Sequence, residues 1–226
     1  MSDFYAFFVR FLPDLLKGAA ITLLLTVQGL SAGFVLGLLA TLARTYGSKF
    51  WRRLAVGYIE LFRGTPLLVQ LFLIYYGLPG LGITLSRELS AFLALGLNSG
   101  AYQAEYLRGS LLAIGDNQMM AGRSIGMSKW KTIWHVILPQ ALRLAIPAWS
   151  NEPVSLLKST AVVFLIAVPE LMAKAKSIAV QTYDPIGAYL AVAIIYMAAV
   201  YLLDAVLRWI ERASRIPGFE TEGKRA

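Results

Sequence analysis

The chain contains no cysteine, and His135 is its single histidine in 226 residues. Without cysteine there is no disulfide framework, no thiolate metal ligand and no cysteine nucleophile. A single histidine removes most zinc sites and most Ser-His-Asp catalytic centres as well. We therefore expect no metal site and no enzyme active site on this chain.

Charged residues are also scarce. Only 15% of the residues are charged, 58% are hydrophobic, and the mean hydropathy is +0.62. Soluble globular chains carry about 25% charged residues. This composition predicts an all-α membrane protein. The formal net charge of +8 fits anionic lipid headgroups and orientation in the bilayer better than nucleic acid. The expected partner is therefore the lipid bilayer, with no nucleic acid.

Five apolar runs are long enough for a transmembrane helix, which needs about 20 mostly apolar residues. They cover residues 19–43, 54–77, 88–112, 138–168 and 187–209. The fourth run contains Pro147 and Pro153. Because proline removes a backbone donor and clashes with the preceding turn, we expect a kinked or broken helix there.

Lys and Arg residues gather in alternate connections between these runs. Segments 44–53, 113–137 and 208–226 together hold twelve of them. Segments 1–18, 78–87 and 169–186 together hold five. Cytoplasmic loops of membrane proteins are enriched in Lys and Arg, so the first set is predicted inside. The N-terminus is then outside and the C-terminus inside, which is consistent with five transmembrane helices.

The two ends of the chain differ from the apolar region between them. Segment 1–18 repeats phenylalanine at helical spacing and lacks the basic start and apolar core of a signal peptide. It predicts a helix that lies on the outer leaflet of the membrane. The transmembrane domain is expected over 19–212, and residues 213–226 are expected to form a polar cytoplasmic tail.

A polar loop at 118–139, QMMAGRSIGMSKWKTIWHVILP, separates the third and fourth apolar runs. Gly122 and Gly126 interrupt it, and Ser128 can cap a new helical turn. Two short helices hinged at Gly126 are therefore expected.

Four apolar residues of this loop form one stripe at i, i+3, i+4 and i+7, namely Trp130, Ile133, Trp134 and Ile137. Such a stripe could enter the groove of a soluble partner. It could equally rest on the membrane surface or on the helices of this protein. Spacing alone leaves both alternatives open.

The loop resembles the signature loop of ATP-binding-cassette importer permeases, in which Glu-Ala-Ala precedes a spaced glycine and then Leu-Pro. Met120, Ala121 and Gly122 occupy the triplet here, so methionine replaces the glutamate and glycine replaces the second alanine. The resemblance implies a cytoplasmic coupling-helix loop that contacts an ATPase. The implied contact residues are Met120, Ala121, Gly122, Arg123, Gly126, Met127, Ser128, Trp130, Trp134 and Pro139.

Three further stretches resemble the branch of that family that carries polar amino acids. They are ELFRGTPLLVQ at 60–70, NSGAYQAEYLRG at 98–109, and Asn151-Glu152 leading to LKST at 157–160. In the last stretch Ser159 stands where an acidic residue is expected. Together the resemblance covers about residues 15–212.

Several polar side chains lie inside the predicted spans. A charge inside the bilayer costs about 2.5 kcal/mol or more, so it normally faces a partner or a water-filled path. Asn98 and Tyr102 share one helix face, and Asn151, Ser155 and Lys158 share another. We predict that the substrate path is lined by Asn98, Tyr102, Asn151, Glu152, Ser155, Lys158 and Thr160. This set offers both acceptors and donors, which an amino acid with its ammonium and carboxylate requires.

Other charged residues favour a structural role over a contact with substrate. Glu105 and Arg108 are three residues apart near the cytoplasmic boundary, as are Glu60 and Arg63, so each pair is expected to form an ion pair. Asp204 and Arg208, four residues apart, are expected to pair in the same way.

Gly29, Gly33 and Gly37 repeat at every fourth position of the first apolar run. Small residues at this spacing allow two membrane helices to approach closely. Close packing of this run against another helix is therefore expected.

The sequence has no Gly-x-x-x-x-Gly-Lys-Ser/Thr phosphate-binding loop, so ATP and Mg²⁺ are expected on partner subunits and no cofactor on this chain. The resemblance implies a multi-pass permease subunit in the bacterial inner membrane that carries polar amino acids by alternating access. It also implies two ATPase subunits, a second permease copy or a sister permease, and an extracytoplasmic amino-acid-binding protein.

An alternative function is a proton-coupled secondary transporter, or a channel, for small polar solutes. Glu105 or Glu152 would then carry protons, and no cytosolic docking surface would be needed. No inverted repeat is visible in the sequence to support this alternative.

Overall fold

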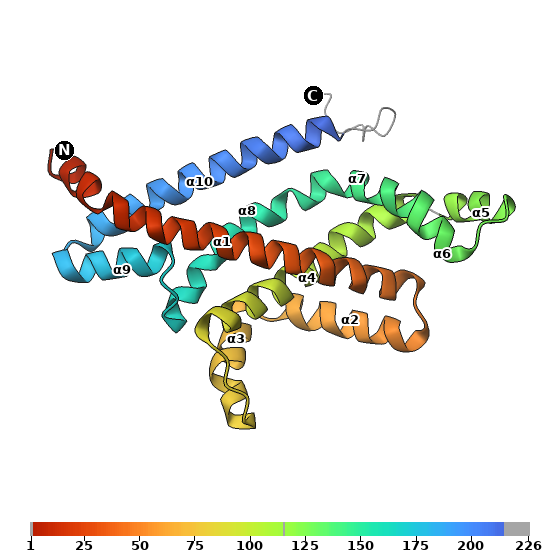
Figure 1. Cartoon of the computed structure of the whole chain (residues 1–226), viewed down its shortest axis with the longest axis horizontal. Helices are drawn as coiled ribbons and strands as arrows, with labels where there is room; N and C mark the ends of the chain where they lie inside the picture. Colours follow the sequence, from red (N-terminus) through yellow and green to blue (C-terminus); the bar gives the residue numbers. More distant parts are fainter. Residues whose placement is uncertain (1, 115, 215–226) are drawn as a thin grey trace.

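The computed structural model describes residues 2–114 and 116–214, and every regular element in that part of the chain is a helix. The main helices are α1 (Ser2–Tyr46), α2 (Lys49–Gly64), α3 (Leu67–Phe72), α4 (Arg87–Ile114), α5 (Asn117–Ser124), α6 (Lys129–Thr132), α7 (Leu138–Trp149), α8 (Asn151–Ser159), α9 (Leu171–Thr182) and α10 (Pro185–Ala213). Figure 1 shows an elongated molecule in which α1 runs along much of the length and the α5–α6 loop forms one end. Most of the predicted tail at 213–226 lies outside the described residues.

Helix α1 continues through the boundary expected at residue 18, so residues 2–18 are the first part of a longer helix. Pro13 lies inside it, and Figure 1 shows the first turns at an angle to the rest, as expected where proline removes a helical hydrogen bond. Phe4, Phe7, Phe8 and Phe11 pack against the apolar cluster that α1 builds with α9 and α10. Their contact with the outer leaflet stays a prediction.

Helices α1 and α4 form the closely packed centre of the fold. A Cβ atom added to Gly33 would lie 2.9 Å from the backbone nitrogen of Gly100, and one added to Gly37 would lie 2.9 Å from the Gly100 carbonyl oxygen. Backbone atoms cannot move aside as a flexible side chain can, so these positions require glycine. The predicted close packing of the glycine repeat is confirmed.

The second apolar run does not form one helix. Helix α2 ends at Gly64, and the segment Leu67–Leu81 that follows turns by 107° from it. Pro66 stands at the corner with φ of −63°, and it has no N–H with which to continue α2. The Gln70 amide fixes the corner by donating to the carbonyl oxygens of Phe62 at 2.8 Å and Thr65 at 2.9 Å.

The break expected in the fourth apolar run is confirmed. The chain forms α7, passes through Ser150, and continues as α8 and a 3₁₀ segment, Thr160–Ile166. Pro153 lies in the first turn of α8, where a missing N–H costs no helical hydrogen bond. Helix α9 then bends by 52° from this segment.

Two helices, Phe4–Tyr46 and Pro185–Ala213, are each long and apolar enough to cross a membrane. The two bent pairs raise this number to four if each forms one span. Helix α4 has 28 residues but carries Glu105 and Arg108, which make it less apolar. A membrane-type helical fold is therefore present, while the count of five spans and the orientation of the termini stay predictions.

Candidate functional site

The polar loop between α4 and α7 forms two short helices, as predicted. Helices α5 and α6 are separated by Gly126, whose φ of +84° is favourable for glycine and strained for other residues. Ser128 caps α6, because its Oγ accepts a hydrogen bond from the backbone N–H of Lys131 at 3.4 Å. The loop continues through a π-helical turn, Ile133–Ile137, into α7 and Pro139.

The two short helices are locked together by a contact between Gly122 and Thr132. Gly122 is buried, and a Cβ atom there would lie 2.5 Å from Cγ2 and 2.7 Å from Oγ1 of Thr132. Thr132 is fully buried and thus fills the space that a methyl group at residue 122 would need. Glycine in the place of the family alanine is explained by this neighbour.

The predicted apolar stripe is divided between two environments. Ile133 and Ile137 are 0% and 2% exposed, and Ile137 packs against Leu111 of α4. Trp130 and Trp134 are 53% and 51% exposed. The stripe is therefore divided between the two alternatives that spacing left open: the isoleucines anchor the loop on this protein's own helices, and the tryptophans face outward.

Most of the other predicted contact residues of the loop are accessible. Met120, Ala121, Arg123 and Gly126 are exposed, and Met127 is half-buried. Met120 lies two residues from the buried Gly122, which places it roughly 160° around α5 from the face that packs on α6, at about 100° per residue. The outer face of α5 is therefore free for a partner.

Lys129 attaches the loop to the end of α1. Its Nζ donates to the carbonyl oxygen of Tyr46 at 2.9 Å and lies 5.7 Å from the centre of the Tyr46 ring. A cation suits the last turn of a helix, where carbonyl oxygens lack helical partners. Sequence reasoning missed this link, because the two residues are 83 positions apart and no local pattern relates them.

Further into the molecule, Glu152 belongs to a buried hydrogen-bonded network. Ser99 Oγ of α4 donates to Glu152 Oε1 at 2.7 Å, and Gln103 Nε2 donates to Ser99 Oγ at 3.0 Å. Trp149 Nε1 in turn donates to Gln103 Oε1 at 2.7 Å. Glu152 is only 4% exposed, so this predicted path residue points into the contact between α8 and α4.

Three other predicted path residues also make contacts within the protein. Thr160 is buried and donates to the carbonyl oxygen of Leu157 at 2.7 Å. Asn98 donates to Gln70 Oε1 at 3.1 Å and so supports the corner between α2 and α3. The Tyr102 ring lies 5.4 Å from the guanidinium carbon of Arg63.

Glu105 gathers arginines from three helices. It pairs with Arg44 of α1, with Arg108 of α4 at 2.7 Å, and with Arg63 of α2 at 3.8 Å. The predicted Glu105–Arg108 pair is therefore confirmed as part of a larger ionic cluster. The cluster is partly buried, and a network of this kind can hold three helices in register.

The predicted Glu60–Arg63 pair does not form in the described part of the chain. Arg63 lies four residues after the buried Ile59, on the face of α2 that packs on α4, and there it meets Glu105. Glu60 is one position further round the helix and is exposed beside Arg53. The face that each residue occupies decides its partner.

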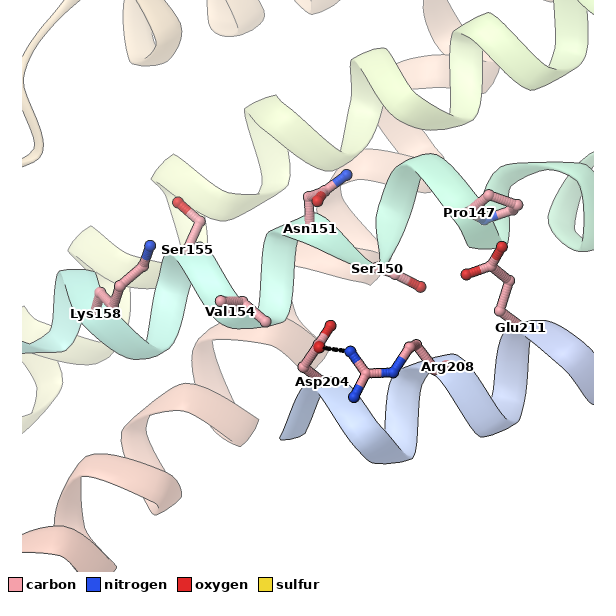
Figure 2. A pocket seen from close by; sticks show the side chains of 9 residues that line it. All are labelled: Pro147, Ser150, Asn151, Val154, Ser155, Lys158, Asp204, Arg208 and Glu211. Carbon is pink, nitrogen blue, oxygen red and sulfur yellow. Dashed lines mark hydrogen bonds and ion pairs between the residues drawn. The ribbon is translucent and has the colours of Figure 1, made fainter. Parts of the chain in front are cut away.

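The remaining predicted path residues line an open pocket of about 420 Å³ between α8 and α10. Figure 2 shows Asn151, Ser155 and Lys158 of α8 on one side and Asp204, Arg208 and Glu211 of α10 on the other. The predicted pair of Asp204 with Arg208 is confirmed. Neither Lys158 nor Glu211 has an ion-pair partner among the residues that the structure describes. The pocket therefore offers one unpaired cation and one unpaired anion.

Glu170 is a further buried carboxylate that sequence reasoning did not identify. It caps α9 by accepting from the Ala173 backbone N–H at 2.8 Å, and it also accepts from Tyr196 of α10 at 3.1 Å and Thr22 of α1 at 3.3 Å. Its place just before a helical segment indicates a cap, but only the fold brings the other two donors to it.

In residues 2–114 and 116–214 no group of three or more His, Cys, Asp or Glu side chains is arranged to hold a metal ion. The absence of any cofactor from this chain stays a prediction.

Comparison with known families gives a match over most of the chain. The family described as "Binding-protein-dependent transport system inner membrane component" matches residues 33–216. The glutamine transport system permease protein GlnP of Escherichia coli (strain K12) is 37% identical over 207 residues, which cover 91% of this chain and 94% of the relative. The L-cystine transport system permease protein TcyB of Bacillus subtilis (strain 168) is 41% identical over 203 residues, or 89% of this chain and 87% of the relative.

Solved structures also resemble this chain. One described as an amino acid ABC transporter with histidines is 36% identical, with a TM-score of 0.84 over 91% of this chain and 96% of that chain. The MetNI methionine ABC transporter in an inward-facing conformation is 23% identical, with a TM-score of 0.75 over 92% of this chain and 99% of that chain. The second likeness concerns the fold alone.

Proposed function

The chain belongs to the family of binding-protein-dependent transport system inner membrane components, and on that premise we propose how it works. It is the transmembrane permease subunit of an ATP-binding-cassette importer, and its cargo is a polar amino acid. The observation that carries this proposal is the family match across the transmembrane region together with an accessible two-helix loop in the middle of it. Relatives named for glutamine and cystine transport support an amino acid as cargo.

The α5–α6 loop is the contact with the ATPase. Its two helices are fixed to each other at Gly122 and Thr132, and Lys129 and Ile137 fix them to α1 and α4. A loop held in this way moves as one body, because packed groups transmit a displacement instead of absorbing it. Movement of the ATPase subunits would therefore reach the transmembrane helices.

The pocket between α8 and α10 is the part of the substrate path that binds cargo. The Lys158 ammonium can bind the substrate carboxylate. Ser155 and Asn151, on the same helix, add neutral hydrogen-bonding groups to the pocket. Asn98, Tyr102, Glu152 and Thr160 shape the path through their contacts with neighbouring helices and without a direct bond to cargo.

Transport follows an alternating-access cycle. Two ATPase subunits bind ATP and Mg²⁺ and close against each other, which draws the loops of two permease copies, or of this chain and a sister permease, together. The pocket then opens to an extracytoplasmic amino-acid-binding protein, and hydrolysis returns it to the inside. We propose that the assembly lies in the bacterial inner membrane, with the N-terminus outside and the C-terminus inside.

The family match and the relatives favour this function over a proton-coupled transporter. The contacts of Glu105, one of the two candidate proton carriers, favour it as well. Glu105 is paired with three arginines, which stabilise its charged form.

Reconstitution separates the two functions. The permease is placed in lipid vesicles with its ATPase and binding protein, and uptake of each of the twenty amino acids is measured with and without ATP. We expect uptake that requires ATP, and its loss when the phosphate-binding lysine of the ATPase is changed to alanine. The matched control is the permease alone under an imposed proton gradient. Accumulation of solute in that control would contradict the proposal.

A further inference from the structure

The outward face of the α5–α6 loop is unusually apolar for a surface that projects from the end of the molecule (Figure 1). Met120 is 59% exposed and Ile125 is 78% exposed, and they lie on the same short loop as the exposed Trp130 and Trp134. We call these four residues the docking tip. Large apolar side chains exposed together on one short segment mark an interaction site.

The tip cannot fold back onto the protein to bury these side chains. The Gly122 face of α5 is already occupied by Thr132, and Met120 lies on the opposite side of that helix. Ile133 and Ile137 already fill the inner side of the segment that carries the tryptophans. The exposure of the tip is therefore fixed by packing and is not a matter of side-chain rotation.

The charges around the tip are mainly positive. Arg123 and Lys131 are exposed beside it. Asp116, one turn before Met120, is also exposed, and the next acidic residue along the sequence is Glu152. Lys129 is engaged by the Tyr46 carbonyl oxygen. A partner that covers this surface needs apolar groups at its centre and carboxylates at its edge, because unpaired like charges would oppose contact.

These observations identify the chemistry of the partner's surface, and the step rests on the proposed function. We propose that the ATPase subunit receives the docking tip in an apolar socket with an acidic rim, and that Met120 enters the centre of that socket. Buried apolar anchors supply most of the affinity of such a contact, while the surrounding charges set the rate of association. This permease therefore selects its own ATPase by a hydrophobic contact at residue 120.

An anionic membrane surface would also suit an apolar tip with cations around it. The position of the loop favours the ATPase, since Figure 1 shows α5 and α6 beyond the ends of α1 and α2. Lipid contact is therefore an outcome that the experiment must detect separately.

The test introduces a carboxylate at the centre of the tip. Met120→Glu and Met120→Leu are each made in the full permease and co-expressed with its ATPase, and the amount of ATPase that co-purifies is measured. Both variants should fold, because residue 120 is exposed. We expect Met120→Glu to retain about tenfold less ATPase, since a carboxylate is costly to bury without a partner, and Met120→Leu to retain the wild-type amount. Equal or greater retention by Met120→Glu would overturn the inference.

A second measurement tests the acidic rim. Lys131→Glu reverses one of the exposed charges beside the tip, and Lys17→Glu makes the same change on α1, far from the loop. The association rate of ATPase with permease in vesicles should fall on adding salt, and should fall about tenfold or more in Lys131→Glu alone. A rate that is insensitive to both changes would contradict an acidic rim.

The lipid alternative is read from tryptophan fluorescence in vesicles with brominated lipids. The signal of Trp130 and Trp134 is the part of the quenching that is lost in the double variant Trp130→Phe, Trp134→Phe, because the chain has three other tryptophans. If bromine quenches that part and added ATPase does not relieve the quenching, the tip lies on the membrane and the inference fails. Failure of the proposed function looks different, because the wild-type permease would then bind no ATPase and need none for uptake. If the wild-type permease binds ATPase and takes up substrate, and Met120→Glu changes neither property, the proposed function holds and only this inference fails.

Discussion

The two faces of α8 show how one short helix can serve two purposes. One face carries Glu152 and is enclosed against α4, where Ser99 satisfies the carboxylate at 2.7 Å. The other face carries Asn151, Ser155 and Lys158 and borders an open pocket opposite α10. Both faces are polar, yet Glu152 receives a hydrogen bond, whereas the Lys158 ammonium has no hydrogen-bond or ion-pair partner among the described residues.

Polarity inside a membrane segment therefore does not by itself identify a binding site. A polar group that is already hydrogen-bonded holds helices together, and a new ligand would have to break that contact. A polar group left open to a pocket is available to a ligand. We therefore expect substitutions in the enclosed clusters to act on stability and substitutions in the pocket to act on transport.

The largest effect is expected at the ionic cluster around Glu105. Glu105→Ala leaves three arginines without their shared partner, and the charge-assisted hydrogen bonds that it loses to Arg44 and Arg108 contribute about 1.5–3 kcal/mol each to the unfolding free energy. Thermal unfolding of the purified permease measures it. Glu60→Ala is the matched control, because Glu60 forms no ion pair in the described part of the chain. Equal losses of unfolding free energy in Glu105→Ala and Glu60→Ala would show that the ion pairs of Glu105 do not stabilise the protein.

The next effect tests the enclosed face of α8. Glu152→Ala removes the acceptor for Ser99 and should lower the unfolding free energy by about 1–3 kcal/mol. Glu152→Gln keeps an acceptor oxygen of similar shape, so unfolding and uptake should both stay close to wild type. A Glu152→Gln protein that is stable but has no uptake would show that the charge itself contacts the substrate. Glu152 would then belong to the substrate path, as the sequence predicted.

Substitutions on the open face of α8 should change transport and leave stability unaltered. Lys158→Ala should reduce uptake by about tenfold or more, because a charge-assisted hydrogen bond to the substrate carboxylate contributes about 1.5–3 kcal/mol. Unfolding and ATPase binding should not change, since Lys158 is exposed in the pocket. Lys17→Ala, an exposed lysine outside the pocket, is the control. Wild-type uptake by Lys158→Ala would remove this pocket from the path.

The smallest effect is expected at the Asp204–Arg208 pair on the α10 side of the pocket. A double-mutant cycle with Asp204→Asn and Arg208→Gln should give a coupling of about 0.2–1 kcal/mol, because both side chains are partly exposed to solvent. Unfolding of the two single variants and the double variant supplies the cycle. A coupling of several kcal/mol would mean that this pair is enclosed in the assembled transporter, and that the pocket is less open than it is in a single chain.

Much of the architecture follows from the sequence. Low charge and long apolar runs predict the membrane class, and the glycine repeat at 29, 33 and 37 predicts close helix packing, because only a missing side chain lets two backbones approach. Pro147 and Pro153 predict the break in the fourth run, and Gly126 and Ser128 predict the hinge and the cap of the loop. These features are local: each depends on what one residue permits in its own backbone.

The sharp corner at Pro66 was harder to predict. Thr65-Pro66 is a visible signal for the end of a helix, but a 107° turn also requires Gln70 to hold two carbonyl oxygens across the corner. An apolar run of suitable length was therefore interpreted as one span.

Helix faces give a partial signal for the candidate site. Glu152 lies four residues before the buried Leu156, so helical spacing could have placed it on the enclosed side of α8. Arg63 similarly follows the buried Ile59 on α2. The polar residues of α8 were predicted to line one path, although the helix places them on two separate faces, one enclosed and one open.

Composition and local backbone chemistry are enough to specify the membrane class, the places where helices break, and a polar loop of two short helices. The partner of each polar group, by contrast, depends on how the helices pack. Glu105 receives arginines from three helices, Lys129 reaches the end of α1, and Lys158 is left open to a pocket. Such partnerships join residues far apart in the chain, and their physical origin is the packing of whole helices, which no local pattern specifies.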